Sequence, residues 1–173
     1  RRAAVLNGGG AGGGAGAPRG RVVQVNVSDG GVPKRPVASA RVTRGGLSGD
    51  RQRDLRYHGG PERAVCLLAL EVIERLRAEG HPIESGSTGE NLTLAGLDWA
   101  ALGQGSRLRF EGGVELEVTG LAAPCPIIRG SFAGGGFARL DGKRHPGEAR
   151  LYCRVLAEGE VRAGEGVEAL AAR

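Results

Sequence analysis

Glycine is the residue that most limits what this chain can fold into. Of its 173 residues, 33 are Gly, whereas Gly makes up about 7 % of average proteins. Each Gly inside a helix costs about 1 kcal/mol relative to Ala, so this composition excludes a helix bundle. The glycines follow no three-residue period, which excludes a collagen-like triple helix. Because 40 % of the residues are hydrophobic, the chain can still bury a core.

The glycines are unevenly distributed, and the first stretch is of low complexity. Residues 7–20 consist almost entirely of Gly and Ala, with too few apolar groups to offset the entropy of ordering them. We therefore expect residues 1–20 to form a flexible tail. Residues 21–173 have the length of one domain, and we expect them to fold as a single unit.

Short β-branched or apolar runs separated by turn residues dominate that domain. In the first run Val23, Val25 and Val27 alternate, so we expect them to share one buried face. One helix is predicted over 70–79, ended by Gly80. This pattern is typical of a mainly β fold, a barrel or a sandwich. The expected β segments are 22–27, 36–43, 64–69, 91–94, 106–110, 114–119 and 149–156, with a last short element over 160–170.

Charge is concentrated in the N-terminal third. Residues 1–60 carry 11 basic and 3 acidic side chains, and residues 61–173 carry 13 and 16. One interpretation is a surface that binds a phosphate-bearing ligand, and the other is an uneven surface charge without function. Aromatic residues amount to 3 %, which leaves few platforms for stacking bases. We therefore expect no nucleic-acid partner.

Cysteine usage and hydropathy point to the cytoplasm. The three cysteines form no CxxC pair, so neither a disulfide framework nor a zinc site is favoured. No apolar run approaches the roughly 18 residues that a membrane span needs. We expect a soluble cytoplasmic protein without a membrane partner.

Cys125 differs from the other two cysteines in its sequence context. Cys66 and Cys153 lie in apolar runs and are predicted to be core residues. Cys125 lies between Pro124 and Pro126, which exclude it from helix interiors and central strands and fix its backbone. A thiol presented by a stiff loop suits a nucleophile or a soft-metal ligand. The alternative is a turn cysteine without a role.

Two glycine-containing loops add candidate binding segments. Residues 44–62 show no periodicity and are rich in Arg and Asp, and long irregular loops in compact domains are usually functional or disordered. Residues 86–89 precede Glu90 and Asn91, and backbone amides in such loops can cradle phosphate.

Four segments, taken together and in order, resemble the MOSC domain family, the C-terminal domain of molybdenum cofactor sulfurase, in its bacterial stand-alone type. The similarity spans about residues 22–170. The segments are VNVSDGGVPKRPV (25–37), GGLSGDRQRDLRYHGGPERAVCL (45–67), GSTGENLTLAGLDW (86–99) and APCPIIRG (123–130).

This resemblance implies a fold and two related activities. The fold would be a distorted antiparallel β-barrel with one or a few short helices. Some members bind a molybdenum cofactor of the molybdopterin type through a single cysteine and reduce N-hydroxylated compounds. Others carry sulfur as a persulfide on that cysteine for the maturation of cofactors or metal–sulfur clusters. The matching cysteine here is Cys125, and a non-catalytic module that binds phosphate ligands is a third hypothesis, from the charge distribution.

The resemblance also suggests site residues and partners. It makes Cys125 the metal ligand and, with His58, a catalytic residue. A small-molecule substrate and a separate electron-transfer protein or cysteine desulfurase are the implied partners. The residues expected near the cofactor are Asp50, Gln52, Glu90 and Asn91 by motif, and Lys34, Arg51 and Arg129 by charge. For Asp50 and Asn91 the alternative is a local role in a turn or at the start of a strand, without cofactor contact.

Overall fold

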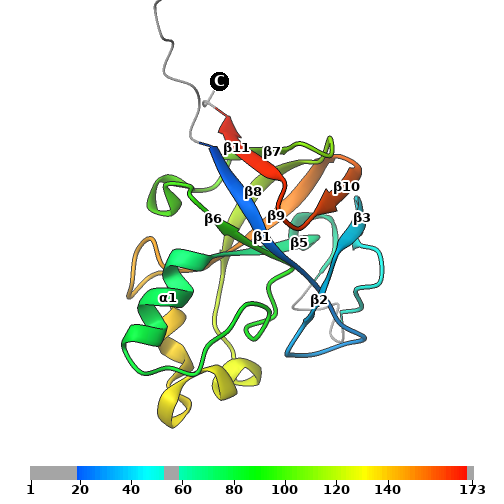
Figure 1. The fold of residues 1–173 in the computed structure, drawn as a ribbon. Coiled ribbons are helices and arrows are strands. Elements are labelled where there is room, and N and C mark those ends of the chain that lie inside the picture. The colour runs from blue at the N-terminus through cyan, green and yellow to red at the C-terminus, as the bar shows by residue number, and fades with distance from the viewer. Residues whose placement is uncertain (1–18, 53–58, 171–173) are drawn as a thin grey trace, which may run out of the picture.

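The structure, a computed structural model, describes residues 19–52 and 59–170 (Figure 1). Of the predicted tail, residues 1–18 lie outside these ranges, whereas Arg19 and Gly20 already belong to the first strand. The strands are β1 (Arg19–Val27), β2 (Arg35–Val37), β3 (Ser39–Thr43), β4 (Gly46–Leu47), β5 (Val65–Ala69), β6 (Leu92–Ala95), β7 (Arg107–Phe110), β8 (Glu115–Ala122), β9 (Arg150–Ala157), β10 (Gly159–Arg162) and β11 (Gly166–Leu170).

A closed β-barrel forms the body of the molecule. Its seven strands follow the order β11-β7-β8-β9-β5-β6-β1, and β1 pairs again with β11 to close the ring. All neighbours are antiparallel except β5 and β6, and β2 pairs with β1 outside the ring. Closure leaves the ring without an open edge. The predicted mainly antiparallel barrel is therefore confirmed.

The register of β1 corrects one prediction. Val22 and Val25 are fully buried, whereas Val23 and Val27 are only partly buried, so the expected alternation of Val23, Val25 and Val27 is wrong. The pairing of β1 with β6 shifts between Val22 and Gln24. Such a bulge adds one residue to a strand and reverses the side chains beyond it.

Two predicted segments each divide into two strands that belong to different sheets. Residues 36–43 contain most of β2 and all of β3, and residues 160–170 contain most of β10 and all of β11. β10, β3 and β4 form a separate three-stranded sheet. Gly164, with a φ of 90°, turns the chain between β10 and β11, a conformation that Gly adopts without strain.

One helix, α1 (Leu70–Ala78), follows β5 directly and lies outside the barrel (Figure 1). It supplies the crossover that the parallel pair β5 and β6 requires. Val72, Ile73 and Leu76 are its buried residues, and Gly80 ends it with a φ of 95°, as predicted.

Short 3₁₀ turns complete the structure. They are η1 (Pro61–Arg63), η2 (Trp99–Ala101), η3 (Pro126–Ser131), η4 (Ala133–Gly135) and η5 (Phe137–Leu140). None of the helices within the described ranges has the length and apolar character needed to cross a membrane.

Candidate functional site

A cavity of about 580 Å³ opens where β8 ends and β9 begins. Several parts of the chain meet there: the turn after β1, the two segments that flank residues 53–58, β5, the loop before β6, the segment from the end of β8 onward, and the start of β9. The described residues that line it are Gly31, Val32, Lys34, Arg51, Gln52, Gly59, Arg63, Cys66, Thr88, Gly89, Asn91, Leu121, Ala123, Pro124, Cys125, Pro126, Ile127, Ile128, Arg150 and Tyr152.

Cys125 lies in the wall of this cavity, on the link between β8 and η3. Its backbone is extended, with φ −135° and ψ 162°, and Pro126 is the first residue of the 3₁₀ turn that follows. The Cys125 carbonyl accepts a hydrogen bond from the Ile128 amide at 3.2 Å. The residue is partly exposed, unlike Cys66 and Cys153. Cys125 thus lies outside helix and strand, between β8 and η3, as its flanking prolines predict.

The other two cysteines are buried, as predicted, but they differ in their surroundings. Burial raises the pKa of the Cys66 thiol to about 11, and the Arg150 guanidinium partly opposes this effect. Burial also raises the pKa of Cys153. Cys153 packs in the core, whereas Cys66 forms part of the cavity wall.

A hydrogen-bonded trio anchors one side of the cavity. Lys34 Nζ donates to Asp50 Oδ1 at 2.5 Å, and Asn91 Nδ2 donates to Asp50 Oδ2 at 2.9 Å. The Lys34 and Asp50 side chains are only 9 % and 5 % exposed. Asn91 Oδ1 also accepts a bond from the Cys66 amide at 3.0 Å. Lys34 and Asn91 line the cavity. Asp50 is absent from the described lining, but its carboxylate holds both of these side chains.

Glu90 organises the loop before β6 from beneath. Its carboxylate accepts hydrogen bonds from the Gly86 amide at 2.5 Å, from Thr88 Oγ1 at 2.7 Å and from Thr93 Oγ1 at 3.2 Å. Burial raises the pKa of Glu90, against the lowering effect of the Gly86 and Thr88 bonds. Glu90 is fully buried and is absent from the described cavity lining. It shapes the loop that presents Thr88 to the cavity.

The tight course of this loop depends on Gly86. Its φ is 84°, and a Cβ atom there would lie 2.4 Å from the Lys34 carbonyl oxygen. The Lys34 amide in turn donates to the Gly86 carbonyl at 2.9 Å. This close approach joins the loop to the turn after β1, so Gly86 serves backbone packing at the cavity edge.

The remaining predicted residues are distributed differently. Arg51 and Gln52 line the cavity, and Arg51, whose side chain is 75 % exposed, lies 3.6 Å from Asp29. Arg129 is exposed, donates to the Pro126 carbonyl at 3.2 Å, and is absent from the described lining. His58 lies outside the described residues.

Sequence reasoning missed the side chains that β9 contributes. Arg150 and Tyr152 line the cavity, and burial raises the pKa of Tyr152 to about 12. The Arg63 guanidinium lies 5.6 Å from the centre of the Tyr152 ring. The alternation that placed Cys153 in the core also places Arg150 and Tyr152 together on the opposite face, and this signal was available in the sequence.

Residues 54–168 match the family described as the MOSC domain. The match covers more than half of the chain. The chain belongs to the MOSC domain family. Lys34, Arg51 and Gln52 precede the matched residues, but the fold of this MOSC domain brings them to the same cavity as Cys125.

Two curated relatives and one solved structure are similar to this MOSC domain. The uncharacterized protein YflK of Bacillus subtilis (strain 168) is 34 % identical over 143 residues, 81 % of this chain and 63 % of YflK. The protein YiiM of Escherichia coli (strain K12) is 28 % identical over 127 residues, 71 % of this chain and 55 % of YiiM. The chain thus spans less than two thirds of either relative. The crystal structure of the YuaD protein from Bacillus subtilis shares the fold, with a TM-score of 0.69 at 20 % identity, over 87 % of this chain and 95 % of that one.

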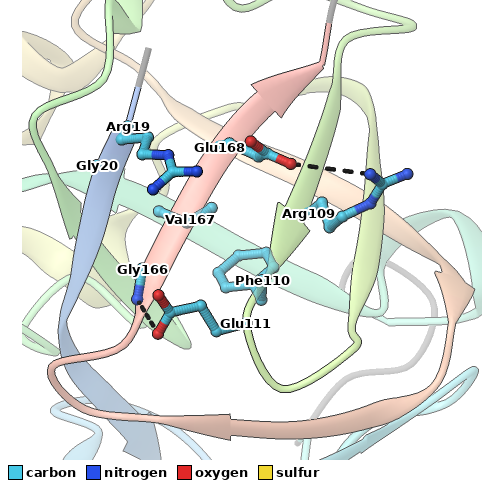
Figure 2. Close-up of a pocket in the computed structure, with 8 residues that line it drawn as sticks. All are labelled: Arg19, Gly20, Arg109, Phe110, Glu111, Gly166, Val167 and Glu168. Atoms are coloured by element: carbon cyan, nitrogen blue, oxygen red, sulfur yellow. Dashed lines mark hydrogen bonds and ion pairs between the residues drawn. The ribbon is translucent and has the colours of Figure 1, made fainter. Parts of the chain in front are cut away.

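A second, smaller hollow of about 180 Å³ lies at the seam where β1, β11 and β7 meet (Figure 2). We call it the seam hollow. Arg109 lies 3.8 Å from the Glu168 carboxylate and 2.8 Å from that of Glu115. Glu111 accepts a hydrogen bond from the Gly166 amide at 3.0 Å (Figure 2). The hollow holds none of the cysteines of this MOSC domain.

Proposed function

We propose that this MOSC domain binds a molybdopterin-type cofactor, with Cys125 as the thiolate ligand of molybdenum, and reduces N-hydroxylated small molecules. The position of Cys125 carries the proposal: it is the partly exposed one of the three cysteines, and it lies in the wall of the large cavity. A cavity of about 580 Å³ is within the range of about 300–1,000 Å³ that small-molecule sites occupy.

The charges and donors of the cavity fit such a group. A thiolate is the soft ligand that suits a metal of this kind. Lys34, Arg51 and Arg150 supply cations for a phosphate and an anionic ring system. Arg150 Nε is buried without a hydrogen-bond partner in the described structure, and its terminal nitrogens are held by the Thr88 and Ala123 carbonyls at the edge of the cavity.

Each wall of the cavity has a distinct task in this proposal. Cys125 must lose its proton to act as a metal ligand, and its prolines hold the sulfur in place without reorganisation. Bound molybdenum would supply a two-electron redox centre. Leu121 and Ile127, 51 % and 48 % exposed, line the same cavity and offer apolar surface to the organic part of a substrate.

The reduction also needs protons and a hydrogen-bond donor at the departing oxygen. Converting an N-hydroxylamine to an amine consumes two electrons and two protons and releases one water molecule. Tyr152 lines the cavity, and burial raises the pKa of its phenol to about 12, so it would donate a hydrogen bond to the departing oxygen while the two protons come from solvent. The electrons would come from a separate electron-transfer protein.

Metal and pterin analysis tests this proposal. Protein made in a host that synthesises molybdopterin should contain about one molybdenum and one pterin per chain, and Cys125→Ala should lose the molybdenum. Cys153→Ala is the matched control, because it removes a thiol from the core and not from the cavity. Wild-type protein that contains neither metal nor pterin would refute the proposal.

Access to the Cys125 thiol favours a second candidate, a sulfur carrier. A sulfane sulfur from the persulfide of a cysteine desulfurase would form a bond to Cys125 Sγ, and the desulfurase thiolate would leave. Intact-mass spectrometry of metal-free protein incubated with a desulfurase and cysteine should then show a gain of about 32 Da, one sulfur atom. Cys125→Ser should abolish it. The absence of that species in wild-type protein would exclude this candidate.

A further inference from the structure

The segment that carries Cys125 is apolar and reaches the surface. Residues 121–128 (LAAPCPII) contain no charged side chain, and the Cys125 thiol is their one polar side-chain group. Leu121 and Ile127 are both about half-exposed, and they are the exposed large hydrophobic side chains of the part of the chain that the structure describes. Ala123 and Pro126, which lie between them, are exposed as well. Apolar surface that gathers at one place within polar surroundings marks an interaction site.

One arginine lies directly beside this apolar segment. Arg129 belongs to η3 and is exposed. Its Nε donates a hydrogen bond to the Pro126 carbonyl at 3.2 Å, so the side chain folds back toward the residue that follows Cys125. The guanidinium charge therefore lies at the edge of the apolar segment.

Two further cations lie at the other end of the segment. Lys143 and Arg144 are exposed and follow Gly142 in the sequence. A Cβ atom on Gly142 would lie 2.9 Å from Leu121 Cδ1, so this part of the chain packs against the Leu121 side chain. Each of the two exposed hydrophobic side chains thus has basic residues close to it.

These three cations have no carboxylate partner within the described part of the chain. Asp141, the acidic residue nearby in sequence, accepts a hydrogen bond from the Lys143 backbone amide at 2.9 Å. Glu148 is bound by Arg75 and Arg139. Basic residues that no neighbouring carboxylate neutralises leave a positive potential at the surface, which attracts acidic partners.

We propose that residues 121–128 together with Arg129, Lys143 and Arg144 form a docking face for an acidic electron-transfer protein. An apolar centre with a charged rim is the usual anatomy of a protein–protein interface. The three cations are absent from the described lining of the cavity, so a small molecule inside it does not cover them. A nucleic acid would use the cations, but it leaves the apolar centre without a partner.

A protein on the docking face lies directly over the Cys125 segment. Two reduced one-electron carriers, each oxidised once, would supply the two electrons that the reduction of an N-hydroxylamine consumes. This role of the partner rests on the proposed function, whereas its binding depends only on the surface. Binding and metal content are therefore measured separately.

Binding to redox proteins of opposite charge tests the docking face. The full chain is passed over an immobilised, acidic plant-type [2Fe–2S] ferredoxin and, separately, over basic cytochrome c. The ferredoxin should bind saturably in about 20 mM salt and at least about tenfold more weakly in about 200 mM salt, because the Debye length falls from about 20 Å to about 7 Å. Cytochrome c should not bind.

Substitutions separate the charged rim from the apolar centre. Arg129→Glu and Arg144→Glu should each slow association with ferredoxin about threefold or more at low salt. Ile127→Ser should raise the Kd about tenfold, mainly through faster dissociation. Arg162→Glu is the matched control, because it makes the same change in net charge on β10, far from the yellow 3₁₀ turns in Figure 1. It should bind ferredoxin as the wild type does.

The outcomes distinguish the docking face from the proposed function. Ferredoxin binding that depends on Arg129 and Arg144, in protein that never acquires molybdenum or pterin, supports the docking face and contradicts the proposed function. Protein that contains both but does not bind ferredoxin overturns the docking face and leaves the proposed function standing. Equal loss of binding in Arg162→Glu, or binding of a cysteine desulfurase or a short DNA duplex in place of ferredoxin, also overturns the assignment.

Discussion

The cavity and the seam hollow are built from similar residues and differ in how their charges are paired. The register of β1, β7 and β8 puts them at opposite ends of the barrel strands. At the seam, Arg109 is held by two carboxylates. In the cavity, Arg150 meets only carbonyl oxygens among the described residues.

This contrast shows that arginine and glycine content does not identify a binding site. At the seam, cations and carboxylates face one another across neighbouring strands, which is ordinary cross-strand stabilisation. The cavity walls come from loops far apart in the sequence, and one of their cations, Arg150, is hydrogen-bonded to carbonyl oxygens and to no carboxylate among the described residues. The way this cation is held, and not the presence of a hollow, distinguishes the cavity.

The largest expected difference concerns the stability of paired charges. Asp50→Ala removes the partner of the buried Lys34 ammonium and should lower the free energy of unfolding by about 3–5 kcal/mol, because an unpaired charge stays buried. At the seam, Glu168→Ala breaks a partly exposed pair and should cost less than about 1 kcal/mol. Urea unfolding measures both values, and equal losses would contradict the comparison.

The site on the cavity side could be predicted only in part from the sequence. Cys125 was identifiable because two adjacent prolines fix its backbone locally. The bonds from Lys34 and Asn91 to Asp50 join residues distant in the sequence, so no local pattern reveals them. Glu90, which the motif places near the cofactor, lies between two cavity-lining residues but is itself buried beneath the loop, and a sequence does not distinguish a wall residue from its support.

The fold was more predictable, since strand and turn signals are local. Gly80 ends the helix as predicted. The strand count alone indicates a barrel or a sandwich, and the resemblance to the MOSC family selects the barrel. The bulge between Val22 and Gln24 escaped prediction because it arises from pairing with β6. Residues 36–43 and 160–170 were each expected to be one element, because nothing local in either run indicates that its two halves pair in different sheets.

The next effect compares the reactivity of the two thiols in the cavity wall, Cys125 and Cys66, with that of the core thiol Cys153. With a pKa of about 11 instead of 9.0, Cys66 should be alkylated by iodoacetamide at pH 8 about 100-fold more slowly than an unperturbed thiol. Its rate should rise with pH until about 11. Cys125 should react first, and Cys153 should stay protected.

Peptide mapping after timed alkylation between pH 7 and pH 10 gives the three rates separately. Rapid modification of Cys66 at pH 8, at the rate found in urea-unfolded protein, would show that the cavity wall does not shield it. Arg150→Lys tests the opposing effect of the nearby guanidinium on the same thiol.

A smaller effect concerns the carboxylate beneath the cavity loop. Because burial raises the pKa of Glu90 above 4.5, the folded chain binds its proton more tightly than the unfolded chain. Its contribution to stability is therefore complete below pH 4.5 and is lost as the pH rises through the folded-state pKa. Glu90→Gln keeps one acceptor oxygen, replaces the other with an NH₂ group that can donate to a threonine hydroxyl, and should remove this loss.

Urea unfolding of both proteins between pH 4 and pH 8 measures the effect. The stability of Glu90→Gln relative to wild type should increase with pH, by at most about 1.4 kcal/mol per pH unit for one group. A constant difference would mean that the three hydrogen bonds hold Glu90 ionised without penalty.

The smallest expected effect is at the other end of the barrel. Burial also raises the pKa of Glu165, and the neighbouring Glu111 carboxylate adds to this. One of its oxygens, Oε1, is buried without a partner among the described residues. The pH dependence of stability has the same sign as for Glu90, so Glu165→Gln should gain stability relative to wild type as the pH rises above 4.5.

The gain should be smaller than for Glu90→Gln, because Glu165 is only partly buried and water screens its charge. A larger gain in the same unfolding series would mean that charge is less well compensated near the seam than beneath the cavity loop, the reverse of the contrast drawn between the two hollows.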